Sequence, residues 1–144
     1  MNREDIKKIL PHREPMLLVD EMIIDENNVV HGKYTIKKDE FFLQGHFPGH
    51  PIVPGVILCE IMGQCSSMLV SRELNGRTPF YTGIDKTRFK NPVHVGDVVE
   101  VTAKIVMHKA MIFFIDAEAS VRGTLCVSSR LSFALVENDK MNDM

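Results

Sequence analysis

The feature that most constrains the fold is a long proline-free stretch at residues 56–74. Its apolar side chains recur at helical spacings, so the stretch is predicted to form a helix. These side chains lie around most of the helical circumference, whereas a helix on a protein surface shows a single apolar stripe. The sequence therefore predicts one helix that is enclosed by the rest of the chain.

Most of the remaining chain consists of runs of strand-forming residues that are separated by turn residues. Two expected strands precede the helix, at residues 16–24 and 29–36, and turn residues separate them. Four more follow the helix, and their short connections imply antiparallel pairing. These four are expected at residues 80–90, 98–107, 111–121 and 124–136. The predicted fold class is α+β, in which a curved antiparallel sheet wraps around one long central helix.

The length and the two ends of the chain suit a single domain. A chain of 144 residues with 44% hydrophobic residues is long enough to bury a core of its own. Asn2 can cap a short helix, which must end before Pro11. We expect one domain over residues 1–136 and a disordered polar tail over residues 137–144.

The charge of the chain argues against a nucleic-acid partner. The 17 Lys and Arg residues and 19 Asp and Glu residues give a net charge of -2, which offers no basic footprint for DNA or RNA. The first residues are polar where a signal peptide is apolar, and no later run has the length of a membrane span. We therefore expect a cytoplasmic protein that does not enter a membrane.

Neither a disulfide framework nor a metal site is indicated. His46 and His50 are four residues apart, as a metal-binding pair on a helix would be, but Pro48 between them prevents a helix and no third ligand is evident. Buried, reduced thiols are expected for the three cysteines, which lack C-x-x-C spacing. They are Cys59, Cys65 and Cys126.

A stiff loop at residues 41–55 carries the first candidate for a catalytic group. Three prolines and three glycines exclude both a helix and a central strand there. They also restrict the backbone around His46, so its imidazole can be held in place at little further cost in entropy, as a general base requires. The alternative is that His46 is an ordinary surface or packing residue.

Glu60 is the second candidate, because it lies among apolar residues of the predicted buried helix. An ionised carboxylate is costly to bury there unless it has a purpose. Gln64 falls on the same helical face, and Gly63 leaves space for a ligand or another backbone to approach. The alternative is that Glu60 faces a solvated edge or pairs with an Arg or Lys.

The start of the helix is the third candidate. The backbone amides of Gly55 and Val56 have no acceptor within the helix, and the positive end of the helix dipole lies beside them. Such amides can receive a carbonyl oxygen that develops negative charge, which is the role of an oxyanion hole. The alternative is an ordinary helix start.

Three motifs and one further segment together resemble one family. The run LPHREPMLLVD at residues 10–20 and the run GHFPGHPIVPGV at residues 45–56 resemble motifs of the FabZ-type β-hydroxyacyl-acyl carrier protein dehydratases of bacterial fatty acid synthesis. The helical run EIMGQ at residues 60–64 and the segment 84–97 continue the resemblance in register. It spans nearly the full chain and implies the hot-dog fold. Departures are confined to Gly63, where alanine is common, and to Glu14 and His50.

The resemblance implies a reaction and roles for the candidate residues. The expected enzyme is a hydro-lyase that removes water from a β-hydroxyacyl thioester on acyl carrier protein without any cofactor. His46 and Glu60 take the catalytic positions, and Gln64 supports them. Related enzymes that also isomerise the double bond carry aspartate at the helix position, so Glu60 implies dehydration to the trans-2-enoyl product alone.

The resemblance also implies partners. The protein is expected to form a homodimer, or a hexamer built as a trimer of dimers, whose sites take histidine and carboxylate from different chains. An acidic carrier protein could dock on three basic residues that alternate along one strand face, although a plain solvated face would look the same. These residues are Lys86, Arg88 and Lys90. Candidate walls for the acyl chain are Phe80, Tyr81 and Phe89.

Two other functions remain open at this point. A hot-dog acyl thioesterase could use the same pocket with a carboxylate that activates water. A catalytically silent protein that only binds acyl carrier protein is the second alternative, and the presence of both His46 and Glu60 argues against it.

Overall fold

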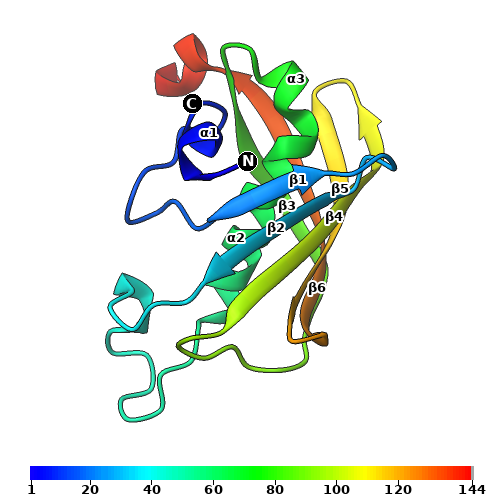
Figure 1. Ribbon diagram of the computed structural model, residues 1–144. Coiled ribbons are helices and arrows are strands. Elements are labelled where there is room, and N and C mark those ends of the chain that lie inside the picture. The colour runs from blue at the N-terminus through cyan, green and yellow to red at the C-terminus, as the bar shows by residue number, and fades with distance from the viewer. Residues whose placement is uncertain (144) are drawn as a thin grey trace.

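The computed structural model describes residues 1–143, apart from the side chain of Arg72. Its six strands form one antiparallel sheet in the order β1-β2-β4-β5-β6-β3 (Figure 1). This is the predicted set of strands, with a shorter first strand and small changes at the ends of the others. The strands are β1 (Glu21–Ile24), β2 (Val30–Thr35), β3 (Arg77–Phe89), β4 (Val98–Lys109), β5 (Ile112–Val121) and β6 (Thr124–Glu137).

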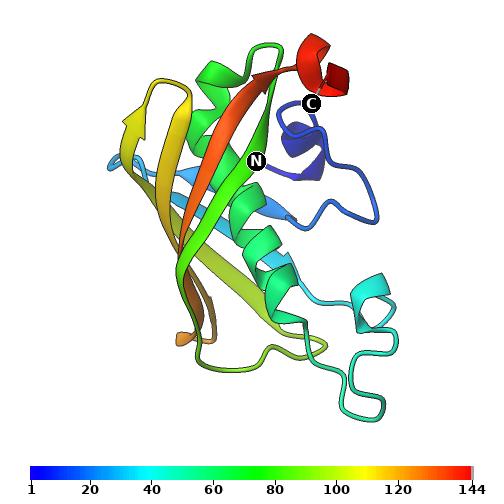
Figure 2. The same cartoon turned by 180° about the vertical axis from the view of Figure 1, so that it is seen from behind.

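The predicted central helix crosses the concave face of this sheet, as the view from behind shows (Figure 2). It comprises α2 (Gly55–Ser67), a 3-10 turn at Met68–Val70 and α3 (Ser71–Leu74). The remaining helical pieces are α1 (Arg3–Lys7) and 3-10 turns at Phe41–Leu43 and Asn138–Asp143. Within residues 1–143, no helix has both the length and the apolar character needed to cross a membrane.

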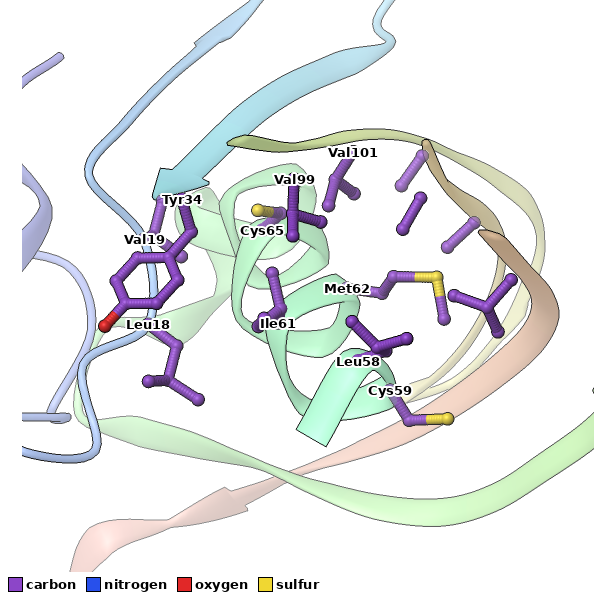
Figure 3. Close-up of a cluster of buried hydrophobic side chains, with 14 of the residues drawn as sticks. Leu18, Val19, Tyr34, Leu58, Cys59, Ile61, Met62, Cys65, Val99 and Val101 are labelled. Atoms are coloured by element: carbon purple, nitrogen blue, oxygen red, sulfur yellow. The ribbon is translucent and has the colours of Figure 1, made fainter. Parts of the chain in front are cut away.

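The helix is enclosed, as its apolar pattern predicts. Leu58, Ile61, Met62 and Cys65 belong to one buried cluster that includes residues of the sheet and of the N-terminal segment (Figure 3). Full burial of a side chain such as Ile61 contributes about 1.5–3 kcal/mol. The core therefore fixes α2 against the sheet and determines where its polar residues can lie.

The three cysteines are free and buried, as predicted. Burial raises the pKa of the Cys65 thiol to about 12, so it remains protonated as part of the core. Cys65 packs so closely on β2 that a Cβ atom at Gly32 would overlap its Sγ atom. A glycine at this position therefore lets α2 approach the sheet.

The first strand is shorter than predicted. β1 begins at Glu21 instead of residue 16. The preceding residues pack on α2, and their backbone groups form hydrogen bonds with side chains instead of with a neighbouring strand. The Leu18 amide donates to Gln64, and the Arg3 guanidinium donates to the carbonyls of Leu17 and Val19. An apolar run without a neighbouring strand thus satisfies its backbone through side chains.

The N-terminal helix begins as predicted, with Asn2 as its cap. Arg3 then joins it to the next segment through ion pairs of 2.9 Å to Glu14 and 3.0 Å to Asp20. The Arg3 guanidinium, with a backbone amide and Lys7, lowers the pKa of Glu14 to about 2. These contacts fix the ends of the segment that carries residues 10–20 across α2.

At the C-terminal end the sheet extends slightly beyond the predicted boundary. Glu137 is the last residue of β6, and Asn138–Asp143 form a 3-10 turn. Met144 lies outside the described residues. The division into a domain at residues 1–136 and a disordered tail stays a prediction.

The sheet has two edges, β1 and β3. β3 is the longer edge strand, and it presents exposed apolar side chains, among them Tyr81, Ile84 and Phe89. A long edge strand with unpaired backbone groups is a ready site for pairing with another chain. The described chain therefore leaves one side of β3 free to pair.

Candidate active site

The loop between the 3-10 turn at Phe41–Leu43 and the start of α2 projects beyond the body of sheet and helix (Figures 1 and 2), and His46 belongs to it. Its ring Nδ1 atom lies 2.8 Å from the carbonyl oxygen of Ile52. A carbonyl oxygen only accepts hydrogen bonds, so Nδ1 carries a proton, and in the neutral ring Nε2 therefore holds the free electron pair. The loop is in turn fixed to the β3–β4 connection, because the Val53 amide donates to the Val93 carbonyl over 2.8 Å. His46 is thus held with Nε2 ready to accept a proton.

A pocket of about 530 Å³ lies beside His46 and is lined mainly by apolar residues. Its lining includes Phe47 from the loop, Gly55 and Val56 from the start of α2, and Phe89 from the end of β3. No side chain caps α2, since Pro54 stands at the N-cap position. The first amides of the helix are therefore free for a ligand, and the structure brings the predicted oxyanion residues together with His46.

Gly55 is required at the helix start by the packing of Phe89. A Cβ atom at Gly55 would lie 2.7 Å from the Phe89 ring. The ring therefore lies directly over the first turn of α2, and it is 57% exposed. Phe89, a predicted wall residue, thus belongs to the His46 pocket, whereas Phe80 does not line it.

Glu60 lies further along α2 in a separate group of polar residues. Its Oε1 atom is 3.3 Å from Gln64 Nε2 and 3.5 Å from His12 Nε2, and its side chain is 23% exposed. Among the described residues it forms no ion pair with Arg or Lys, which was one alternative for this position. Gln64 is only 1% exposed and also bonds to the Leu18 amide and the Met16 carbonyl, over 2.8 and 2.7 Å.

Within one chain, the His46 pocket and the polar group around Glu60 are separate. Within residues 1–143, no hydrogen bond or ion pair connects His46 with Glu60, and Glu60 does not line the His46 pocket. From Gly55 to Glu60 the helix rises by about 7.5 Å. The structure thus brings His46 together with Gly55 and Val56, and it brings Glu60 together with Gln64.

Tyr81 connects β3 to the part of α2 that carries Glu60. Its hydroxyl donates to the Cys59 carbonyl over 2.9 Å, and its ring lies 4.7 Å from that of Phe133. Burial and the nearby Glu60 carboxylate raise the pKa of this hydroxyl. A Cβ atom at Gly63 would overlap the Tyr81 hydroxyl, so glycine at this position leaves room for the hydrogen bond of Tyr81 to Cys59.

Replacing Gly63 by alanine is expected to lower the free energy of unfolding by about 1–3 kcal/mol, because the new methyl group overlaps the Tyr81 hydroxyl. Thermal unfolding of four proteins measures this effect: wild type, Gly63→Ala, Tyr81→Phe and the double variant. Removal of the hydroxyl relieves the closest overlap but leaves the ring carbon Cζ 2.8 Å from the new Cβ atom, so the alanine should cost less, but still measurably, in the Tyr81→Phe background. An equal cost in both backgrounds would contradict the assigned contact.

Lys86, Arg88 and Lys90, the predicted docking residues, are exposed, but they do not alternate as predicted. The register of β3 on β6 shifts between Asp85 and Arg88, and Lys86 has a φ of 52°. This bulge interrupts the alternation, so the prediction of one shared strand face is wrong. Lys90 follows the end of β3 and lines the His46 pocket.

His12 is the residue that the sequence analysis missed. It was noted only as part of the motif at residues 10–20, yet its ring contacts Glu60. The segment around His12 has neither helical nor strand periodicity, so its sequence does not indicate which way the His12 side chain points. The resemblance of the motif was the one signal that this segment matters.

Solved structures share the fold. The dehydratase heterocomplex ApeI:P from Xenorhabdus doucetiae matches with a TM-score of 0.80 at 21% identity, covering 96% of this chain and 95% of that one. A putative thioesterase of Ralstonia eutropha matches with a TM-score of 0.64 at 17% identity, covering 79% and 83%. At these identities the likeness shows the fold alone. The predicted hot-dog fold is confirmed.

Sequence comparison gives the family. The model of the FabA-like domain matches residues 10–130. The chain is 42% identical over 138 residues to the 3-hydroxyacyl-(acyl-carrier-protein) dehydratase FabZ of Clostridium perfringens, covering 94% of this chain and 99% of the relative. The FabZ of Caldicellulosiruptor saccharolyticus is 41% identical, covering 90% and 95%. The chain therefore belongs to the FabA-like family, as one of its FabZ-type dehydratases.

Proposed function

We propose that this chain is a hydro-lyase that converts β-hydroxyacyl-acyl carrier protein into the trans-2-enoyl form in fatty acid biosynthesis. The names of the FabZ relatives, at 41–42% identity over nearly the full chain, support the substrate and the reaction. The observation that carries the proposal is the geometry at His46. A histidine with a free Nε2 atom lies in an apolar pocket beside uncapped helix amides.

The reaction needs a base at the α-carbon and an acid at the β-hydroxyl group. His46 Nε2 takes the α-proton, and the electron pair of that bond moves toward the thioester carbonyl. The amides of Gly55 and Val56 stabilise the charge on the carbonyl oxygen. Glu60 then protonates the hydroxyl group as its bond to carbon breaks and the double bond forms. Water leaves, and a proton passes from His46 back to Glu60 to restore the site.

Glu60 must reach the pocket of a partner subunit for this reaction, because one chain keeps it apart from His46. The free edge of β3 supports a homodimer in which two β3 strands pair antiparallel. Such pairing brings the Phe89 end of one strand beside the Arg77 end of the other. The first end belongs to the His46 pocket and the second leads to Tyr81 and Glu60. A trimer of such dimers is the alternative assembly.

Product analysis tests the proposed function directly. The purified protein is incubated with β-hydroxyacyl-acyl carrier protein, and the acyl group is identified by mass spectrometry. Loss of one water from a cargo that stays on the carrier supports dehydration. Release of the free carrier thiol would support the thioesterase, and an unchanged cargo would support the silent binder. The thioesterases among the similar structures share only the fold at 11–19% identity, so they do not favour hydrolysis.

We also propose that Lys86, Arg88 and Lys90 attract the acidic carrier protein. All three are exposed, and Lys90 lines the pocket that would admit the acyl arm. A positive surface steers an acidic partner and disfavours a basic one. The three free cysteines suit a reducing compartment, which supports a cytoplasmic location.

Reversal of these three charges to glutamate is expected to raise the KM for carrier-bound substrate by about tenfold or more, equivalent to ~1.4 kcal/mol of lost binding. The KM for a small pantetheine thioester should change much less, because it lacks the acidic surface. Steady-state kinetics with both substrates measures the difference. Lys33→Glu on β2, far from β3 in the strand order, is the matched control. Equal changes for both substrates would exclude a docking role.

A further inference from the structure

His12 lies next to Glu60 on a segment that is fixed from both sides. Its carbonyl oxygen accepts a hydrogen bond of 2.7 Å from Arg13, whose guanidinium also bonds to the carbonyls of Leu10 and Lys7. After His12, the segment is bound to α2 through the hydrogen bonds of Gln64 to Met16 and Leu18. The backbone of His12 is thus held at a set distance from the helix, and its ring is directed at Glu60.

The hydrogen bonds of Gln64 determine which oxygen of Glu60 can carry a proton. The Leu18 amide donates to Gln64 Oε1, which fixes the orientation of the side-chain amide. Gln64 Nε2 is then a donor, and it donates to Glu60 Oε1 as well as to the Met16 carbonyl. Glu60 Oε1 must therefore be an acceptor. The proton of a neutral Glu60 belongs on Oε2.

The second nitrogen near Glu60 Oε1 is Nε2 of His12, at 3.5 Å. The other ring nitrogen of His12, Nδ1, is buried and has no hydrogen-bond partner among the described residues. A proton on Nδ1 would be a buried donor without an acceptor, which is costly, and a doubly protonated ring would add a charge. The neutral ring with its proton on Nε2 avoids the charge and leaves Nδ1 as a buried acceptor, and it directs a donor at Glu60 Oε1 where the other tautomer would direct a lone pair.

We infer that His12 is a positioning residue for Glu60. This inference rests on the proposed function, since it concerns how Glu60 acts as the acid. The Nε2–H group of His12 and the amide of Gln64 both engage Oε1, so Oε2 carries the proton that goes to the departing hydroxyl group. The separation of 3.5 Å is longer than a good hydrogen bond, and we expect it to shorten when substrate fills the site.

A matched pair of substitutions tests the inference. In His12→Gln the side-chain nitrogen takes the place of Nε2 and can still donate to Glu60. In His12→Asn it takes the place of Nδ1 and cannot. His12→Asn is expected to lower kcat by about 100-fold with little change in KM, because the acid is misplaced. His12→Gln is expected to keep kcat within about tenfold of the wild type. Equal kcat values for the two variants would overturn the inference.

Two further measurements separate this inference from the proposed function. In a Glu60→Gln background, which tests the function itself, His12→Asn should cause no further loss of kcat, because residues that act as a unit are not additive. A full further loss would assign His12 a role independent of Glu60 and overturn the inference. Heteronuclear NMR of the isotopically labelled wild-type protein near neutral pH should show the Nε2–H form of His12. Observation of the Nδ1–H form would overturn the inference even if dehydration is confirmed.

Discussion

Replacement of Glu60 by glutamine is expected to lower the turnover number for dehydration by about 100- to 10,000-fold, the range in which a general acid contributes. Glutamine has nearly the same shape and can still bond to Gln64, so the fold and the oligomeric state should be unchanged. The formation of enoyl product in a spectrophotometric assay measures the loss. Turnover near that of the wild type would exclude Glu60 as the acid.

His46→Ala should cause a similar loss through removal of the base.

Mixing these two inactive variants shows whether the subunits share their sites. Coexpressed His46→Ala and Glu60→Gln chains should recover about one quarter of the wild-type activity per chain. Random pairing makes about half of the dimers mixed, and a mixed dimer with shared sites has one intact site of two. No recovery would show that each site uses residues of one chain.

The cis arrangement of the same substitutions is the matched control. A double variant with both changes is coexpressed with the wild-type chain in equal amounts. With shared sites, both sites of every mixed dimer are damaged, so about one quarter of the wild-type activity should remain. Sites within single chains would leave about one half.

Substitution of Gln64 by leucine is expected to have the largest effect on stability. Gln64 is fully enclosed and satisfies the Leu18 amide and the Met16 carbonyl, where β1 has not yet begun. Leucine fills the space but leaves both backbone groups without partners, at about 1–3 kcal/mol each. We expect a loss of about 3 kcal/mol in the free energy of unfolding, which corresponds to a fall of about 10 °C in Tm.

Ser66→Ala on the same helix is the control for Gln64→Leu. Ser66 is also buried, but its hydroxyl donates over 2.7 Å to a carbonyl within its own helix, at Met62. Its removal leaves no backbone group without a partner, so the change in Tm should be small. Thermal unfolding of the two variants in parallel checks both expectations. An unchanged Tm for Gln64→Leu would show that water or a shift of the segment replaces the lost bonds.

The enclosed helix could be predicted because it depends on a property that the sequence displays directly. A helix that is apolar around its whole circumference must be covered on most sides, and in a chain of this length a curved sheet that wraps around it is one of the few ways to do so. The stiffness of the loop around His46 was equally visible, since Pro and Gly act on the backbone locally. The motif resemblance then gave His46 and Glu60 their roles, which remain predictions until the variants are measured.

The errors concern contacts between residues far apart in the chain. The shortened β1 depends on Gln64, which lies 46 residues after Leu18. The contact between His12 and Glu60 likewise joins two segments that no local pattern relates. The bulge at Lys86 arises from the register of β3 on β6, and no glycine marks it at that position. Sequence periodicity describes one segment at a time, so it could not find these features.

The hydrogen bond between His46 and the Ile52 carbonyl limits how the base can meet the substrate in the proposed reaction. The ring cannot turn over without the loss of this bond, so the same nitrogen meets the acyl chain in every cycle. For a substrate seated in one orientation, this fixed nitrogen reaches only one of the two hydrogens on the α-carbon. In the reverse direction, addition of water delivers hydrogen to that same face.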